Sequence, residues 1–248
     1  MIMKSLHNLF SSTALSMRTK STLILFITTL FITFSSAAQS IEPFEARYHV
    51  YRGDTHVANS KLSLHKQNGE WVWFMNTEPR GIYSWLTKKQ PFTETRMQNS
   101  PTGLQLLLEN SGEYQNKPPQ QSDWFDYTTR IIYHMKDGNI SQIKLPDDVY
   151  NYQSVHTLYP QMLSQHKLQL PINFYRNGAV TKSTLTLEKA FPIPDKSGTI
   201  KVDKITQTFD QSDKQMIYYY QGGSIAPLKI EQIKRGKDSS VMWRVDLK

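Results

Sequence analysis

Residues 130–145 read Arg-Ile-Ile-Tyr-His-Met-Lys-Asp-Gly-Asn-Ile-Ser-Gln-Ile-Lys-Leu. The pair Asp137-Gly138 lies at the centre of this stretch, between two runs rich in isoleucine. Asp-Gly reaches positive φ at little cost, which two-residue hairpin turns require. The stretch therefore predicts two antiparallel strands joined by a tight turn.

The same pattern recurs along the chain. Asn68-Gly69, Asn177-Gly178 and Gly222-Gly223 are further hairpin signals. Apolar and polar residues alternate around Ala46–Tyr51 and again from Val241 onward, which is typical of an antiparallel sheet with one buried face. About a dozen strands are expected at this spacing. We therefore predict a mainly β fold, an antiparallel meander curled into a barrel or half-barrel.

One segment, residues 153–167, departs from the strand pattern. Val155, Leu158 and Met162 lie at helical spacing, so one short helix is expected near residues 153–167. Pro160 marks either the start of this helix or a kink. A second short helical turn is expected over Ile82–Leu86. The polar stretch of residues 111–122 is expected to be a surface loop between strands, and no domain boundary is evident.

The first 38 residues have the parts of a secretory signal. Arg18 and Lys20 supply positive charge, an apolar run follows over residues 23–32, and Ser36 and Ala38 precede the expected cut. The alternative is a membrane-spanning helix, but this run falls short of the about 20 apolar residues that a span needs. Met17, directly before the basic residues, is an alternative start of translation.

A signal peptide at the N-terminus predicts an exported domain after it. We predict a cleaved signal peptide over residues 1–38 and a single β-rich periplasmic domain over residues 39–248. The sequence has no cysteine, which excludes disulfides and a lipid-modified N-terminal cysteine, so no stable membrane anchor is expected.

The charge of the exported part is small. Without Lys4, Arg18 and Lys20 it holds 26 basic and 21 acidic residues, a net charge of +5. This balance permits an anionic partner, such as a lipid headgroup or glycan, and also fits an ordinary solvated surface. No basic stripe indicates nucleic acid.

Sequence motifs of common catalytic sites are missing. The chain lacks Gly-x-Ser-x-Gly, Gly-x-Gly-x-x-Gly and His-Glu-x-x-His, and its histidines form no ligand pair. No catalytic residue, metal or cofactor is therefore predicted. Asp123, Asp126 and Glu78 are the acids that an enzyme acting on glycans would use, if they faced each other across a cleft.

The most distinctive segment is Glu78-Pro79-Arg80-Gly81-Ile82-Tyr83-Ser84-Trp85-Leu86. Arg80, Tyr83 and Trp85 could present a guanidinium and two rings to an amphipathic ligand. The alternative is a strand-to-turn corner whose aromatic residues plug a barrel end, with Arg80 paired to Glu78 or Glu94. The candidate ligand-binding residues are Glu78, Arg80, Tyr83, Trp85 and Trp124. Most other aromatic residues are expected to fill the core.

Four stretches carry a family resemblance: Pro43–Val50, Glu78–Leu86, Phe92–Glu94 and Ala226–Glu231. In these stretches the chain is similar to the exported bacterial proteins grouped as domain of unknown function 3108. The resemblance implies a periplasmic, β-rich, barrel-like domain, and it brings no catalytic residues with it.

The expected function is a non-enzymatic periplasmic factor for envelope maintenance or assembly, which binds a lipid, a glycolipid or an outer-membrane client. One alternative is an enzyme acting on cell-envelope glycans. Another is a protein-interaction module that pairs a client strand to an open sheet edge.

Overall fold

The computed structural model describes residues 41–246, with gaps at 88, 102, 115–116, 196–197 and 235–236. The predicted signal peptide, residues 1–38, lies outside the described residues. The first eight strands are β1 (Phe44–Arg52), β2 (Thr55–Gln67), β3 (Glu70–Pro79), β4 (Phe92–Ser100), β5 (Gly103–Gly112), β6 (Gln121–Asp126), β7 (Ile131–Lys136) and β8 (Asn139–Lys144). The others are β9 (Val149–Tyr150), β10 (Gln169–Arg176), β11 (Ala179–Asp195), β12 (Gly198–Phe209), β13 (Ser212–Tyr220), β14 (Lys229–Lys234) and β15 (Lys237–Arg244).

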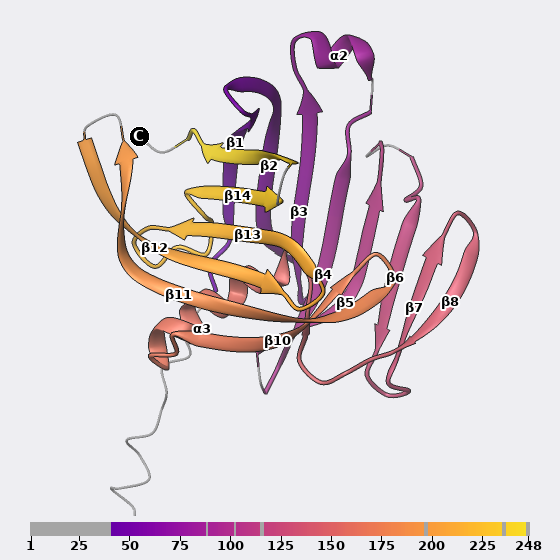
Figure 1. The fold of residues 1–248 in the computed structure, drawn as a ribbon. Coiled ribbons are helices and arrows are strands. Elements are labelled where there is room, and N and C mark those ends of the chain that lie inside the picture. Colours follow the sequence, from indigo (N-terminus) through magenta and orange to yellow (C-terminus); the bar gives the residue numbers. More distant parts are fainter. Residues whose placement is uncertain are drawn as a thin grey trace, which may run out of the picture. The chain divides into compact units, whose positions relative to one another are not determined.

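These strands form one 15-stranded sheet built from two meanders. β1 to β8 are neighbours in chain order, as are β9 to β15, and β1 pairs with β15 where the two meanders meet. The β9–β10 pair is parallel, whereas β1 pairs antiparallel with both of its neighbours. Figure 1 shows the two meanders running at a steep angle to each other, so the sheet is strongly curved. The predicted curled meander is confirmed.

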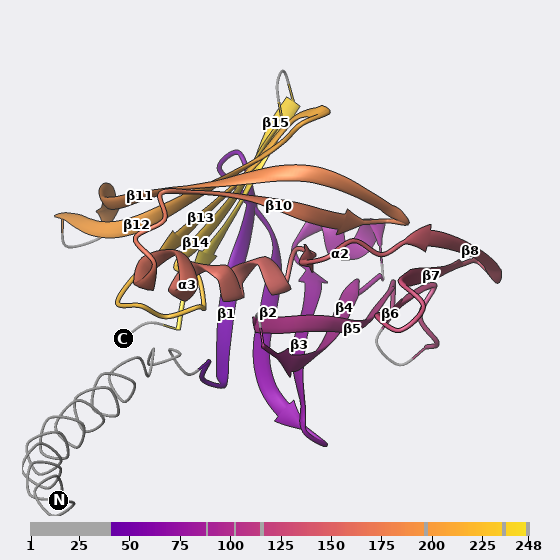
Figure 2. The same ribbon diagram turned by 90° about the horizontal axis from the view of Figure 1, so that it is seen from below.

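A short helical segment lies on the concave side of the sheet, between the two meanders (Figure 2). The 3-10 turn η1 (Ser154–Thr157) continues into α3 (Leu158–Ser164), which confirms the predicted helix. Pro160 lies in the first turn of α3, where its missing N–H removes no helical hydrogen bond. Before η1, Asn151 Oδ1 accepts a hydrogen bond of 2.8 Å from the backbone N–H of Ser154.

Three of the four predicted turns are two-residue hairpins in which both residues have positive φ. The φ values are 52° and 85° in Asn68-Gly69, 50° and 80° in Asp137-Gly138, and 47° and 77° in Asn177-Gly178. The prediction is wrong for Gly222-Gly223. These glycines belong to a longer connection, residues 221–228, because Ile225 in this connection packs into the core.

The sheet has apolar residues on both faces of the second meander. The main core fills the concave side and includes Tyr218 and Tyr220 of β13. A smaller cluster on the other face includes Ile217 and Tyr219. β11 contributes to both clusters because a bulge between Glu188 and Phe191 shifts its alternation by one residue.

Candidate functional site

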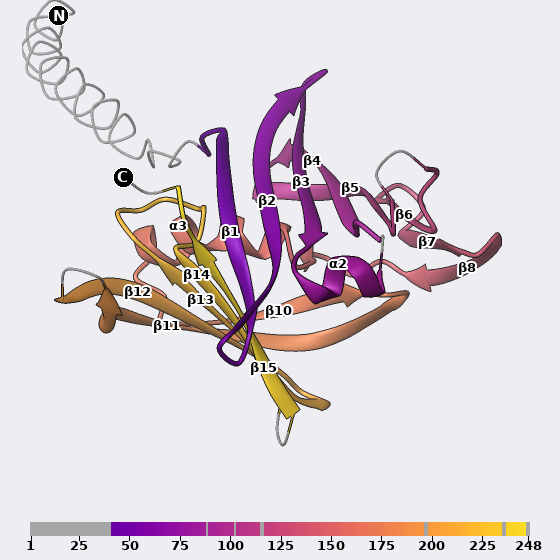
Figure 3. The same cartoon turned by 90° about the horizontal axis from the view of Figure 1, so that it is seen from above.

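The connection between β3 and β4 carries a short helix, α2 (Ile82–Leu86), none of whose residues is buried. We call Arg80–Leu86 the α2 tip. The backbone N–H of Arg80 donates a 2.9 Å hydrogen bond to the carbonyl of Val57 on β2, and Gly81 then turns the chain with φ 56°. Glycine reaches this left-handed conformation without steric cost. Figure 1 shows α2 standing beyond the ends of the neighbouring strands, and Figure 3 shows it at the end of β3.

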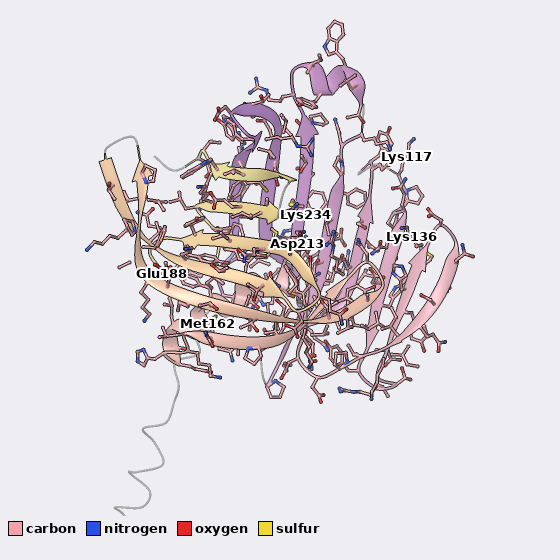
Figure 4. All side chains as sticks on the ribbon, viewed as in Figure 1. Lys117, Lys136, Met162, Glu188, Asp213 and Lys234 are labelled. Carbon is pink, nitrogen blue, oxygen red and sulfur yellow. The ribbon has the colours of Figure 1, made fainter. Side chains whose placement is uncertain are left out.

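The α2 tip exposes three large apolar side chains. Trp85 is 91% exposed, Leu86 75% and Ile82 69%. Figure 4 shows side chains of α2 projecting away from the sheet. Three exposed apolar side chains on one short element make the α2 tip a candidate interaction site. The expectation that aromatic residues of this segment plug a barrel end is therefore wrong for Trp85, because α2 is directed away from the core.

Positive charge lies at the base of the α2 tip. Arg80 is exposed, and none of the ion pairs among the described residues joins it to Glu78 or Glu94 as predicted; Glu94 pairs with Arg96 at 2.7 Å. The imidazoles of His49 and His56 have their centroids 4.2 Å apart. Burial, followed by the charges of His56 and Arg80, lowers the pKa of His49. The lowered pKa disfavours the charged form of His49, so the cation that an anionic surface would meet beside the apolar tip is Arg80.

The structure brings together three of the five predicted ligand-binding residues. Arg80, Tyr83 and Trp85 lie in the α2 tip, and the exposed Glu78 lies near the end of β3, two residues before it. Trp124 is on β6, with Leu108 and Tyr133 as its partners on the neighbouring strands. It is 39% exposed and does not belong to the tip.

A second candidate site lies on the concave face. Thr95, Glu109, Asp123 and His134 are directly opposite one another on β4, β5, β6 and β7. Directly paired residues point to the same face of a sheet, so these four side chains form one line, which we call the polar row. On the other side of Thr95 the same line continues through Trp73 on β3. Along this line the concave face is therefore apolar at β3 and polar from β4 to β7.

Asn151 connects the polar row to the helical segment. Its Nδ2 donates to Thr95 Oγ1 at 3.0 Å and to Glu109 Oε2 at 2.5 Å. Burial raises the pKa of the Glu109 carboxyl to about 7; the hydrogen bond from Asn151 opposes this shift, and the charge of Asp123 adds to it. Glu109 therefore gains or loses its proton near neutral pH.

Asp123, His134 and Tyr175 link the two meanders. His134 Nδ1 on β7 lies 2.5 Å from Asp123 Oδ1 and 3.3 Å from Tyr175 Oη on β10. Gln121 Nε2 donates to the other oxygen of Asp123 at 2.7 Å, and the backbone N–H of Gly178 donates to Tyr175 Oη at 3.1 Å. Because β7 and β10 belong to different meanders, this cluster holds the concave face together.

An Asp–His pair also occurs in sites for nucleophilic and general-base catalysis. Here the turn between β10 and β11 covers the imidazole, because a Cβ on Gly178 would lie 2.8 Å from both Nε2 and Cδ2 of His134. The ring edge that would face a substrate thus packs against backbone. The arrangement fits a structural link better than a reacting base.

The three acids required by the glycan-enzyme alternative do not face one another. Asp123 is fully buried on the concave face. Asp126 accepts hydrogen bonds from the backbone N–H groups of Thr128 and Thr129, at 2.9 and 3.1 Å, and these bonds fix the turn after β6. Glu78 is exposed near the end of β3. The pair of carboxylates that glycoside hydrolysis needs is therefore not assembled from these acids.

The described ranges hold neither a cluster of metal ligands nor a helix of membrane-spanning length. No group of three His, Cys, Asp or Glu side chains in them is placed to hold a metal ion. None of their helices has the length and hydropathy that a membrane-spanning segment requires.

Comparison with known proteins identifies the fold of this chain. No protein-family model and no curated protein matches the chain, whereas three solved chains do. One of these is a β-barrel-like protein of domain of unknown function DUF1849 from Brucella abortus, with 9% identity and a TM-score of 0.51. The match covers 83% of this chain and 96% of that chain. This chain therefore has a β-barrel-like fold.

Proposed function

We propose that this protein is an exported, non-enzymatic cell-envelope factor whose α2 tip binds the surface of a lipid membrane. The observation that carries the proposal is the exposure of Trp85, with Leu86 and Ile82 beside it on one short helix. Tryptophan is enriched where membrane and water meet, because its ring is apolar and its N–H is polar. A small apolar element of this kind enters the headgroup region without spanning the bilayer.

The exposed area accounts for weak, reversible binding. Fully burying one large apolar side chain is worth about 1.5–3 kcal/mol. Three side chains that are largely exposed at the start would give about 5 kcal/mol, a dissociation constant of about 0.2 mM. Basic residues near an anionic surface add about 1 kcal/mol each. Arg80, directly before α2, provides such a charge, whereas Lys89 after α2 is paired with Glu113.

A surface site is preferred to a lipid pocket on the concave face. Protein side chains already occupy that face: Tyr159 of α3 stacks on Tyr220 with ring centroids 4.2 Å apart, and both are buried. A lipid chain there would have to displace α3. The α2 tip needs no rearrangement to meet a bilayer.

The place of action follows from the predicted signal peptide, residues 1–38, which supports a periplasmic location. We also propose membership in the exported proteins of domain of unknown function 3108. Support comes from the stretches Pro43–Val50, Glu78–Leu86, Phe92–Glu94 and Ala226–Glu231.

Vesicle flotation tests the proposal. The purified protein is mixed with vesicles of phosphatidylethanolamine and phosphatidylglycerol, and the floating fraction is measured. We expect the protein to float and Trp85→Ser to reduce the floating fraction, whereas Trp124→Ser, which changes a tryptophan on β6, leaves it unchanged. Equal losses in both variants, or no flotation of the unchanged protein, would contradict the proposal. Capture of an envelope protein by the α2 tip without vesicle binding would instead favour a protein client.

A further inference from the structure

Lys214 is a buried lysine without a carboxylate partner. It has the same parity along β13 as Met216 and Tyr218, which belong to the main core, so its side chain starts on the concave face. Its Nζ donates a 2.7 Å hydrogen bond to Tyr152 Oη. None of the ion pairs within the described chain includes Lys214.

Two further cations lie close to Lys214. The guanidinium carbon of Arg176, at the end of β10, is 5.7 Å from the centroid of the Tyr152 ring. Lys234, at the end of β14, is the direct neighbour of Lys214 in the strand register, and Figure 4 labels it there. Burial, together with the charges of Arg176 and Lys234, lowers the pKa of Lys214 to about 8. The charges that act on this ammonium are therefore of its own sign.

The Lys214 ammonium has the hydroxyl and the ring of Tyr152 as partners but no anion, and an anion beside it would offset more of the cost of its burial. A lysine ammonium has three N–H donors. The hydrogen bond to Tyr152 uses one of them, so two remain for a ligand. A guanidinium stacked on an aromatic ring keeps its N–H edge available, and this edge fits the oxygens of a phosphate group in pairs. Arg176, Lys214 and Lys234 thus present the donors and charge that phosphate recognition uses.

We propose that Lys214, Arg176 and Lys234, the first two of which lie beside the Tyr152 ring, bind the phosphate group of a ligand. The site is built on β10, β13 and β14 and shares no element with the α2 tip, so it does not depend on the function proposed above. The phosphate group would belong either to a small soluble phosphate or to a lipid headgroup.

Amide NMR with inorganic phosphate tests the site directly. The titration is run on the whole exported protein at constant ionic strength and pH 6. There Lys214 is charged and Glu109, the acid that acts on Tyr152, is largely protonated. We expect saturable shifts of the amide signals of Tyr152, Arg176 and Lys214, and smaller or no shifts with acetate.

Variants identify the cations that bind. Lys214→Met keeps the length of the side chain and removes its charge, and we expect about tenfold weaker phosphate binding, as for the loss of one charged hydrogen bond. Arg176→Gln should weaken binding to a similar extent. Lys201→Met is the matched control, because Lys201 is an exposed lysine on β12, and it should bind like the unchanged protein.

A second arm identifies the source of the phosphate. Short-chain phosphatidylglycerol, kept below its micelle concentration, replaces inorganic phosphate in the same titration. Tighter binding of this lipid than of phosphate supports the site and assigns it to a lipid headgroup, whereas binding of phosphate alone supports the site for a small phosphate. The proposal is overturned if neither compound gives saturable shifts, or if Lys201→Met and Lys214→Met weaken binding equally.

Discussion

The imidazole of His156 lies flat on the indole of Trp73, with ring centroids 5.0 Å apart and planes inclined by 8°. His156 Nδ1 also lies 2.7 Å from Tyr220 Oη on β13. One side chain of the helical segment thus joins β3 in the first meander to β13 in the second. Burial lowers the pKa of His156 to about 3, so its ring is neutral wherever the protein is folded near neutral pH.

His156 makes the folded state sensitive to acid. In the unfolded chain its pKa is about 6.5, so between pH 6.5 and 3 the unfolded state binds one more proton than the folded state. Stability contributed by this residue therefore falls as the pH falls, by about 2 kcal/mol at pH 5. His156→Gln should remove this dependence in urea unfolding at pH 7 and pH 5. His65→Gln, at an exposed position on β2, should not change it. An unchanged pH dependence in His156→Gln would rule out this role.

The stability that Glu109 contributes has the opposite dependence on pH. Its carboxyl has a pKa of about 7 in the folded protein and about 4.5 in the unfolded chain, so the folded state holds more protons between these values. Stability therefore falls as the pH rises from 4.5 to 7, by about 3 kcal/mol. Glu109→Gln cannot ionise and should gain about that much relative to the unchanged protein between pH 4 and pH 8.

Chemical unfolding across this range measures the Glu109 effect. Glu78→Gln serves as the control, since Glu78 is exposed near the end of β3, and it should gain nothing. If Glu109→Gln and the unchanged protein had parallel stability curves, the buried carboxyl would not titrate as described.

Alanine substitutions at two hairpin glycines distinguish the cost of backbone strain from the cost of a steric contact. Gly178 has φ +77° and lies against His134, whereas Gly138 has φ +80° and would have open space around an added Cβ. Both changes to alanine incur the left-handed backbone cost of about 1–2 kcal/mol. Gly178→Ala should lose about 1–3 kcal/mol more, because its Cβ would displace the His134 ring. Thermal unfolding of the two variants checks this, and equal losses would show that His134 does not pack tightly on the turn.

Local features of the fold could be predicted from the sequence. The pairs Asn68-Gly69, Asp137-Gly138 and Asn177-Gly178 need only their own φ preferences, and all three form tight turns. Gly222-Gly223 has the same preferences but lies in a longer connection, because burial of Ile225 outweighs the local signal. The turn type can thus be predicted from the sequence where no long-range contact competes with the local φ preferences.

The candidate sites were only partly predictable. The composition of Glu78–Leu86 indicates a distinctive segment, but its exposure depends on how Gly81 directs α2. The polar row has no such local signal. Glu109 and Asp123 become neighbours through the register of β5 and β6, whose connection includes the long polar stretch of residues 113–120. That register is set by burial across the whole sheet, so no local pattern in the sequence indicates it.

Membrane binding should depend on the place of an apolar side chain and not on its exposure alone. Ile82 on α2 and Ile140 on β8 are 69% and 65% exposed. Ile82→Ser should weaken vesicle binding by about 1 kcal/mol, roughly fivefold, because its partial burial in the bilayer is lost. Ile140→Ser removes the same group from the β8 edge and should leave binding unchanged. Vesicle titration of both variants measures the difference, and equal affinities would count against the α2 tip.

The central claim is that Trp85 enters the bilayer, and quenching of its fluorescence by brominated phospholipid tests this most directly. We predict that brominated vesicles quench the unchanged protein and Trp124→Phe to the same extent, and that Trp85→Phe abolishes most of this quenching. Bromine quenches only over short distances, so the signal reports contact with lipid chains. Quenching that is unchanged in Trp85→Phe, or absent from the unchanged protein when it is mixed with anionic vesicles, would contradict the account.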